Sequence, residues 1–246
     1  MNTNNQIDNL IKTTVDNATT PNNCRIEHHA TLFALLSKAI IKAKGEEGRE
    51  DIVKAITQYA AERGQRMAAS ALANGEALDL VSSIAYGEWV ADPNEIDVRV
   101  EQTTPSYITQ TLLCPWVTAW NKHNLMEYGK YYCLTVDDAI YSGFNPDFKC
   151  TVYSTISWGD DKCRFDWNQP LSDEESQRLA AKKAALGMTV KRDFNFHAAH
   201  LLHTVSGYLS DKYPADGAVI IGRALTEFAD LFGGEYLLAL IGAYDK

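Results

Sequence analysis

The sequence has few basic residues and no long hydrophobic run. Its 246 residues include 23 Lys and Arg against 32 Asp and Glu, which gives a formal net charge of -9. Because an acidic chain repels a phosphate backbone, we expect no nucleic-acid partner. The apolar run over residues 236–243 is much shorter than the roughly 20 residues of a membrane-spanning helix. The first residues also lack a signal-peptide pattern. We therefore expect a soluble, cytoplasmic protein with no membrane partner.

Several sequence motifs of well-known enzyme classes are absent. There is no Gly-x-Gly-x-x-Gly, no P-loop, no Gly-x-Ser-x-Gly and no kinase motif set. Nucleotide cofactors are therefore not expected. The 5 cysteines are an odd number in a chain without a secretion signal, so a disulfide framework is not expected either. The thiols are then buried apolar groups, metal ligands or reactive groups.

Changes of periodicity along the chain predict three sections. Residues 1–23 are rich in Asn and Thr and predict a loose polar arm that can contain one short helix around residues 7–12. Residues 24–170 predict one α+β domain, with helices over residues 25–90 and a sheet core over residues 95–168. Residues 171–246 are predicted to be helical and to pack on that core, where they cover a pocket or build a homodimer.

Alternating apolar and polar residues predict four strands in two hairpins. The strands are expected at residues 96–101, 107–113, 148–158 and 163–167, and a helix at residues 116–140. Short turns join neighbouring strands in antiparallel order. The predicted fold class is therefore α+β: a four-stranded antiparallel sheet in the order β-β-α-β-β, flanked by N-terminal helices and a C-terminal helical section.

Three cysteines mark ends of the predicted elements. Cys114 follows the second strand, Cys133 lies late in the central helix, and Cys163 opens the fourth strand. A helix packed across the sheet could bring them together as a catalytic pocket or a zinc site. Spacing alone favours three small buried residues instead, because no Cys-x-x-Cys pair exists. Cys150 alternates with core residues, and Cys24 carries no signal.

Two polar residues of the central helix are candidates for proton transfer. Asp137 follows Cys133 by four residues, so that on one helix the two share a face. This spacing suits an acid/base group beside a nucleophile or a metal-bound water; a solvated Asp near a helix end is an equal alternative. His123 is the histidine closest in sequence to the cysteines, and it could supply a base.

His197, His200 and His203 form a stripe on a predicted helix. The stripe could line a pocket or bind a metal ion. The polar face of an amphipathic helix is the favoured interpretation, because apolar residues occupy the opposite face. No carboxylate stands at the position that a zinc protease motif requires.

Several linked motifs occur in a fixed order between residues 114 and 167. They are Cys114-Pro115-Trp116, Glu127-Tyr128-Gly129, Tyr132-Cys133 with Asp137-Asp138, Gly143-Phe144-Asn145-Pro146, and Gly159-Asp160 with Cys163-Arg164-Phe165. With the helices upstream of them, over roughly residues 25–168, they resemble the L-2-amino-thiazoline-4-carboxylic acid hydrolase family. Because several linked motifs agree, we favour a functional site at the three cysteines over the interpretation from spacing that they are small buried residues.

The resemblance implies a small-molecule hydrolase that opens a C–N bond of a thiazoline-like or cyclic amidine-like heterocyclic acid. We expect a cysteine nucleophile, with Cys133 favoured over Cys163 and Cys114, and Asp137 or His123 as the proton carrier. The expected substrate-binding residues are Trp116, Tyr128, Asn145 and Asp160. No cofactor is expected; the alternative is zinc held by Cys114, Cys133 and Cys163.

The β-β-α-β-β core and the Gly-Asp-x-x-Cys turn also resemble the 4-vinyl reductase-type ligand-binding domains. This second resemblance implies a non-catalytic sensor or carrier of small molecules, in some cases with a cysteine-bound zinc. A cysteine that those domains carry four residues before the turn glycine is Thr155 here, which argues against a zinc site of that kind. A lyase or isomerase acting on a heterocycle is the third alternative.

Overall fold

The computed structural model describes residues 3–15 and 20–244 and divides the chain into two compact units. Unit 1 consists of Met1–Tyr59, Pro115–Leu134 and Asp193–Lys246, and unit 2 of Ala60–Cys114 and Thr135–Arg192. Each unit combines segments that are far apart in the sequence. The boundaries therefore differ from the sequential division at residues 23 and 170.

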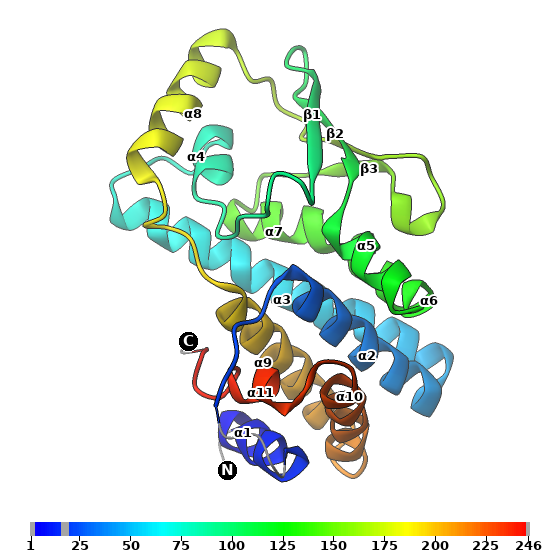
Figure 1. Ribbon diagram of the computed structural model, residues 1–246. Coiled ribbons are helices and arrows are strands. Elements are labelled where there is room, and N and C mark those ends of the chain that lie inside the picture. Colours follow the sequence, from blue (N-terminus) through cyan, green and yellow to red (C-terminus); the bar gives the residue numbers. More distant parts are fainter. Residues whose placement is uncertain (1–2, 16–19, 245–246) are drawn as a thin grey trace. The chain divides into compact units, whose positions relative to one another are not determined.

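Unit 1 is all helical among its described residues. It contains α1 (Thr3–Thr14), α2 (Ile26–Lys44), the first part of α3 (Glu46–Ala73), α5 (Pro115–Lys122), α6 (Met126–Gly129), the 3-10 helix η1 (Lys130–Leu134), α9 (Phe194–Lys212), α10 (Gly217–Phe232) and α11 (Gly234–Leu238) (Figure 1). Helix α2 is its centre and packs against α5, α6, α9 and α10. The sequence of α2 explains this position, because nearly every side chain from Ile26 to Ile40 is buried.

The N-terminal helix is longer than the short helix expected in a loose polar arm, and it is docked rather than loose. Helix α1 buries Ile7 and Ile11, which lie four residues apart on one helical face. Two apolar side chains are enough to dock this otherwise polar helix on α9 and α10. Residues 16–19 of the predicted arm lie outside the described residues.

Unit 2 contains the sheet, and the predicted fold class is confirmed. Its strands are β1 (Asp97–Gln102), β2 (Ile108–Leu113), β3 (Thr151–Ser154) and β4 (Cys163–Asp166), and all neighbours pair antiparallel in the order β1-β2-β4-β3. The helices of this unit are the second part of α3, α4 (Leu80–Ala85), α7 (Val136–Phe144), α8 (Asp173–Leu186) and the 3-10 helix η2 (Ile156–Trp158).

The third strand is shorter than predicted. Residues 156–158 form η2, which ends at Gly159 in the left-handed region at φ 101°. The Asp160 carboxylate accepts a hydrogen bond from the backbone N–H of Thr155 at 2.8 Å. This local bond competes with strand pairing and turns the chain out of the sheet at Thr155.

The predicted central helix is divided into shorter pieces. Cys133 lies in η1, whereas Asp137 lies in the first turn of α7, and Thr135 between them is the N-cap of α7. The expectation that the two residues share one face of a continuous helix is therefore wrong.

Two glycines let α3 and α7 approach closely within unit 2. A Cβ on Gly64 would lie 2.1 Å from the carbonyl oxygen of Ile140, and a Cβ on Gly143 would lie 2.5 Å from that of Ala61. Only glycine allows backbones to approach this closely. No described helix is long and apolar enough to cross a membrane.

Candidate functional site

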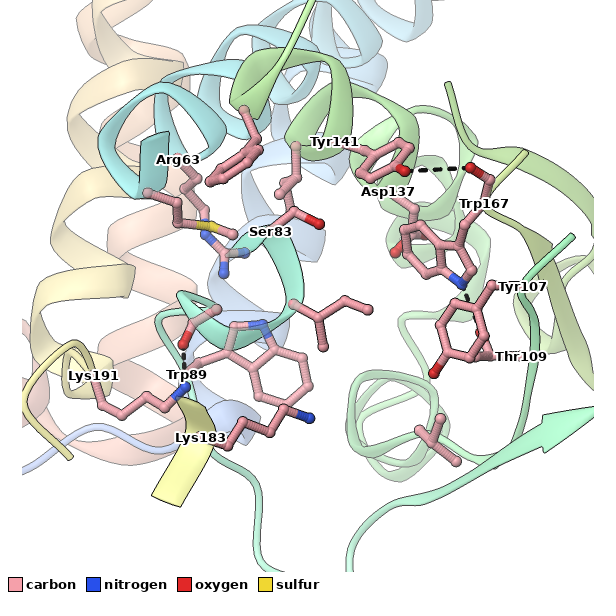
Figure 2. A pocket seen from close by; sticks show the side chains of 16 residues that line it. Arg63, Ser83, Trp89, Tyr107, Thr109, Asp137, Tyr141, Trp167, Lys183 and Lys191 are labelled. Carbon is pink, nitrogen blue, oxygen red and sulfur yellow. Dashed lines mark hydrogen bonds between the residues drawn. The ribbon is translucent and has the colours of Figure 1, made fainter. Parts of the chain in front are cut away.

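Unit 2 contains a cavity of about 440 Å³. The volume lies within the range of roughly 300–1,000 Å³ that is typical of small-molecule sites. Its walls combine a few charged groups with aromatic side chains, as Figure 2 shows. The charged groups are Arg63, Asp137, Lys183 and Lys191, and the aromatic groups are Trp89, Tyr107, Tyr141, Phe144 and Trp167.

Asp137 is the acidic residue in this lining. Burial raises the pKa of its carboxyl to about 6, because desolvation penalises the charged form. Arg63 and the residue's own backbone N–H oppose this effect, and the neighbouring Asp138 adds to it. A carboxyl with this pKa can both accept and donate a proton near neutral pH, which is the property of a general acid/base.

Arg63 is held by a buried ion-pair network. Its Nε lies 3.8 Å from a carboxylate oxygen of Glu88, and both side chains are about 95 % buried, with 4 % and 5 % exposed. Arg66 binds the same carboxylate through two hydrogen bonds, at 2.7 and 2.8 Å. The three groups together carry one net positive charge. Glu88 thus keeps Arg63 in place at the cavity wall.

The aromatic wall is fixed by its own hydrogen bonds. The indole N–H of Trp167 donates to the Thr109 hydroxyl at 3.1 Å, and the Tyr141 hydroxyl donates to the Trp167 carbonyl at 3.3 Å. Gln169 donates to the Tyr141 hydroxyl at 2.8 Å. The rings of Tyr141 and Trp167 meet edge to face, with centroids 5.3 Å apart. The wall is therefore pre-organised for a flat ligand ring.

Two of the predicted cysteines, Cys114 and Cys163, lie in unit 2. Cys163 is buried and pairs in register with Thr111 of β2, and its thiol accepts the backbone N–H of Ile156 at 3.4 Å. Burial raises the pKa of this thiol to about 11; the Ile156 N–H opposes the rise, and Cys114, Asp137 and Asp160 add to it. Cys163 is thus protonated near neutral pH, which makes it a poor nucleophile without a base.

The other predicted site residues of unit 2 have local structural contacts. Asn145 donates from its side-chain amide to the Leu78 carbonyl at 2.9 Å and accepts the Asp147 N–H at 3.0 Å. The Asp160 carboxylate accepts the Thr155 N–H, as described above. Of all the predicted site residues, Asp137 is the one that appears in the described cavity lining.

The remaining predicted site residues belong to unit 1. Cys133 is partly exposed in η1, and Tyr128 is half-buried in α6. Trp116 is buried and its indole N–H donates to Nδ1 of His29 at 3.2 Å. His123 lies 2.6 Å from the Glu27 carboxylate.

The three histidines of α9 correct the expectation of a solvated polar face. His197, His200 and His203 are all buried in unit 1. The Tyr244 ring stacks on His200 with centroids 4.4 Å apart and lies 6.0 Å from His203, while Tyr59 lies 4.6 Å from His200 on the other side. The aromatic rings thus cover the helix face that the amphipathic pattern predicted to be exposed to solvent.

Among residues 3–15 and 20–244, no group of three or more His, Cys, Asp or Glu residues could hold a metal ion.

A family profile, L-2-amino-thiazoline-4-carboxylic acid hydrolase, matches residues 24–167. The match covers more than half of the chain. The chain belongs to this family. The family name implies a hydrolase. No curated protein and no solved structure matches the chain significantly.

Several cavity residues were missed by the sequence analysis. Arg63 lies in a long helix whose pattern indicated only packing, and Trp89 lies in a segment without periodicity. Lys183 and Lys191 lie beyond the segment that matches the family. A basic residue on an exposed helix carries no signal in one sequence, because most such residues are simply solvated.

Proposed function

We propose that the cavity of unit 2 is the active site of a small-molecule hydrolase that opens the ring of an amino-thiazoline-type or cyclic amidine-type acid. The observation that carries the proposal is Asp137, a carboxyl with a pKa raised to about 6 that lines a cavity of ligand size. The family name supports the substrate class. The pre-organised aromatic wall suits contact with a small unsaturated ring.

In the proposed reaction, Asp137 acts first as a base and then as an acid. The carboxylate takes a proton from a water molecule while the water oxygen bonds to the ring carbon between the heteroatoms. The tetrahedral intermediate then breaks one ring bond to that carbon. The leaving heteroatom takes the proton from Asp137, which restores the carboxylate. The net change is the addition of one water molecule, and Asp137 is unchanged at the end.

Arg63 supports this role by its charge. Its guanidinium opposes the effect of burial on the Asp137 pKa, so that the carboxylate form is accessible near neutral pH. Without that charge, burial alone would keep the carboxyl protonated to a higher pH, and the base would be lost.

Water is the nucleophile in this proposal because its activation requires only one base, and Asp137 in the cavity lining can serve as that base. The Cys163 thiol, with its pKa raised to about 11, is protonated at neutral pH. The prediction that Cys133 is the nucleophile rests on the resemblance, and a separate variant tests it.

The test is turnover of L-2-amino-thiazoline-4-carboxylic acid by the purified full-length protein. Mass spectrometry should show a product heavier by one water molecule. The predicted C–N cleavage releases a primary amine, whereas C–S cleavage releases a thiol, so amine and thiol assays identify the broken bond. Asp137→Asn should lower kcat by about 100-fold or more. The control Asp161→Asn removes an exposed carboxylate outside the described cavity lining and should keep full turnover.

Binding without catalysis is the second candidate function, and the aromatic wall favours it. A sensor or carrier would bind flat heterocyclic acids without converting them. It would also bind them at least as well after Asp137→Asn, which removes the repelling carboxylate. Tight binding of thiazoline acids and cyclic amidines with no ring-opened product would select this function over the hydrolase.

A further inference from the structure

Two lysines line the cavity from a part of the chain that the family profile does not match. Lys183 lies near the end of α8, and Lys191 lies in the segment that follows it, whereas the family match ends at residue 167. Both residues belong to unit 2. The C-terminal section thus adds two cationic groups to the wall of a cavity that otherwise consists of family-matched residues.

Helix α8 is anchored so that these lysines have defined positions. A reciprocal capping box between Ser172 and Glu175 starts the helix. Arg178 then forms an ion pair with Asp79, the N-cap of α4, at 2.6 Å, and Lys182 pairs with Glu76. These contacts join α8 to α4 and to the segment before it.

The environment of the two lysines suits an anion. Burial lowers the pKa of both amines, and Lys183 lowers the pKa of Lys191 further by repulsion, which Glu88 partly offsets. The Lys191 amine donates to the Gly87 carbonyl, which uses one of its three protons. Two neighbouring ammonium groups in a partly dry wall repel each other, and a bound anion relieves that repulsion.

The charges of the cavity are arranged on two sides. Lys183, Lys191 and Trp89 lie on one side, and Asp137, Trp167 and Tyr107 lie on the other (Figure 2). A carboxylate ligand is attracted to the lysine side and repelled by the Asp137 carboxylate. A flat acid bound with its anionic end at the lysines therefore directs its ring toward Asp137 and the aromatic wall.

We propose that Lys183 and Lys191 bind the carboxylate of the substrate and orient its ring toward Asp137. These lysines are then specificity residues that the C-terminal section adds to the family domain. The proposal rests on the proposed function in that it concerns the same cavity. It makes a separate claim, however, because it predicts selective binding of acids whether or not they are hydrolysed.

The test uses 2-aminothiazole-4-carboxylic acid, an aromatic analogue that resists ring opening, and its neutral carboxamide. Quenching of tryptophan fluorescence reports binding, since Trp89 and Trp167 line the cavity. Each of Lys183→Met and Lys191→Met should weaken binding of the acid by about tenfold or more, the usual contribution of a charge-assisted hydrogen bond. Binding of the carboxamide should change little. Lys183→Arg, which keeps the charge, should retain most of the affinity.

Lys149→Met is the matched control, because Lys149 is an exposed lysine of unit 2 outside the described cavity lining. It should bind the acid like the wild type. Thermal denaturation checks that all variants are folded. Loss of acid binding in the control to the same extent would overturn the inference. So would unchanged acid binding in both lysine variants, or no binding of the acid to the wild type.

The outcomes separate this inference from the proposed function. If thiazoline acids bind in a lysine-dependent way but no ring-opened product forms, the anion site stands and the hydrolase fails. If the ring is opened with unchanged KM in both lysine variants, the hydrolase stands and the anion site fails. For an active enzyme we expect KM to rise about tenfold or more in each variant while kcat changes less.

Discussion

Arg63 of α3 and Asp137 of α7 line the same cavity, and the guanidinium opposes the effect of burial on the carboxyl pKa. The two side chains come from distant parts of the sequence. Their helices approach closely at Gly64 and Gly143. The acid/base properties of the site therefore depend on a helix crossing that contains no reactive group.

Asp137→Asn should remove activity and yet stabilise the protein at neutral pH. The pKa of Asp137 is about 6 in the folded chain against an ordinary value of 3.8. The folded state therefore binds the proton more tightly than the unfolded state. The resulting stability is fully present below about pH 4, and it is lost as the pH rises through about 6. This loss amounts to at most about 3 kcal/mol.

Chemical denaturation at pH 4 and pH 7 measures this effect. The free energy of unfolding of Asp137→Asn should exceed that of the wild type by about 2 to 3 kcal/mol at pH 7 and by little at pH 4. Asp161→Asn should show no such pH dependence. If Asp137→Asn is no more stable than the wild type at pH 7, burial does not destabilise this carboxylate.

The pH dependence of catalysis follows from the same carboxyl. As the initial base, Asp137 must be deprotonated, so kcat/KM should rise with pH, reach half its maximum at a midpoint of about pH 6 and level off above about pH 7. Initial rates measured over about pH 4.5 to 8, in buffers of constant ionic strength, test this pH dependence. A rate that falls through the same midpoint would assign Asp137 the role of initial acid instead.

Gly64→Ala should destabilise the protein and disturb the site. The new Cβ would lie 2.1 Å from the Ile140 carbonyl oxygen, so α3 and α7 must separate. We expect a loss of at least about 2 kcal/mol in the free energy of unfolding. Gly222→Ala in α10 is the control, because its Cβ would meet only Leu10 Cδ1, at 3.7 Å. It should gain about 0.5 to 1 kcal/mol. Equal stabilities of the two variants would contradict the close helix contact.

Glu88→Gln should destabilise unit 2 through its two arginine partners. The change leaves the charges of Arg63 and Arg66 without their buried counter-ion, and the expected cost is about 3 to 5 kcal/mol. Glu46→Gln, which removes the partner of Arg49 in an exposed pair, should cost less than about 1 kcal/mol. Denaturant titration compares the two. A similarly small effect at both positions would show that the Glu88 network is dispensable.

Cys133→Ala tests the thiol mechanism directly. With water as the nucleophile, the variant should keep turnover of L-2-amino-thiazoline-4-carboxylic acid within a few fold. A loss of about 100-fold or more, together with a substrate adduct on Cys133 in the intact mass of the wild type, would establish the thiol mechanism instead. Cys150→Ala removes a buried thiol and controls for the loss of a cysteine.

Much of the architecture could be predicted from periodicity. The alternation over residues 96–101 and 107–113 correctly predicted the first hairpin. For the third strand and the central helix, local hydrogen bonds made the predicted bounds wrong. The hydrogen bond to the Asp160 carboxylate ends β3 early. Thr155 is the N-cap of η2, and Thr135 is the N-cap of α7. New helices therefore begin within segments whose hydropathy pattern is continuous.

The histidine stripe shows a different limit of sequence analysis. The amphipathic pattern of α9 predicted solvent on the side of His200, but Tyr59 and Tyr244 cover that side. A pattern within one helix shows which of its faces are apolar. It does not show that aromatic rings from other segments make a second, polar face buried as well.

The sequence by itself determined the α+β class, the antiparallel hairpins, the family and the candidacy of Asp137, because local periodicity and linked motifs are properties of neighbouring residues. The tertiary structure decided which groups share the cavity. Arg63, Trp89, Lys183 and Lys191 come together in the cavity lining only in the folded chain. The pKa of Asp137 was decided there too, since desolvation depends on what surrounds a carboxyl in space rather than on what precedes and follows it in the chain.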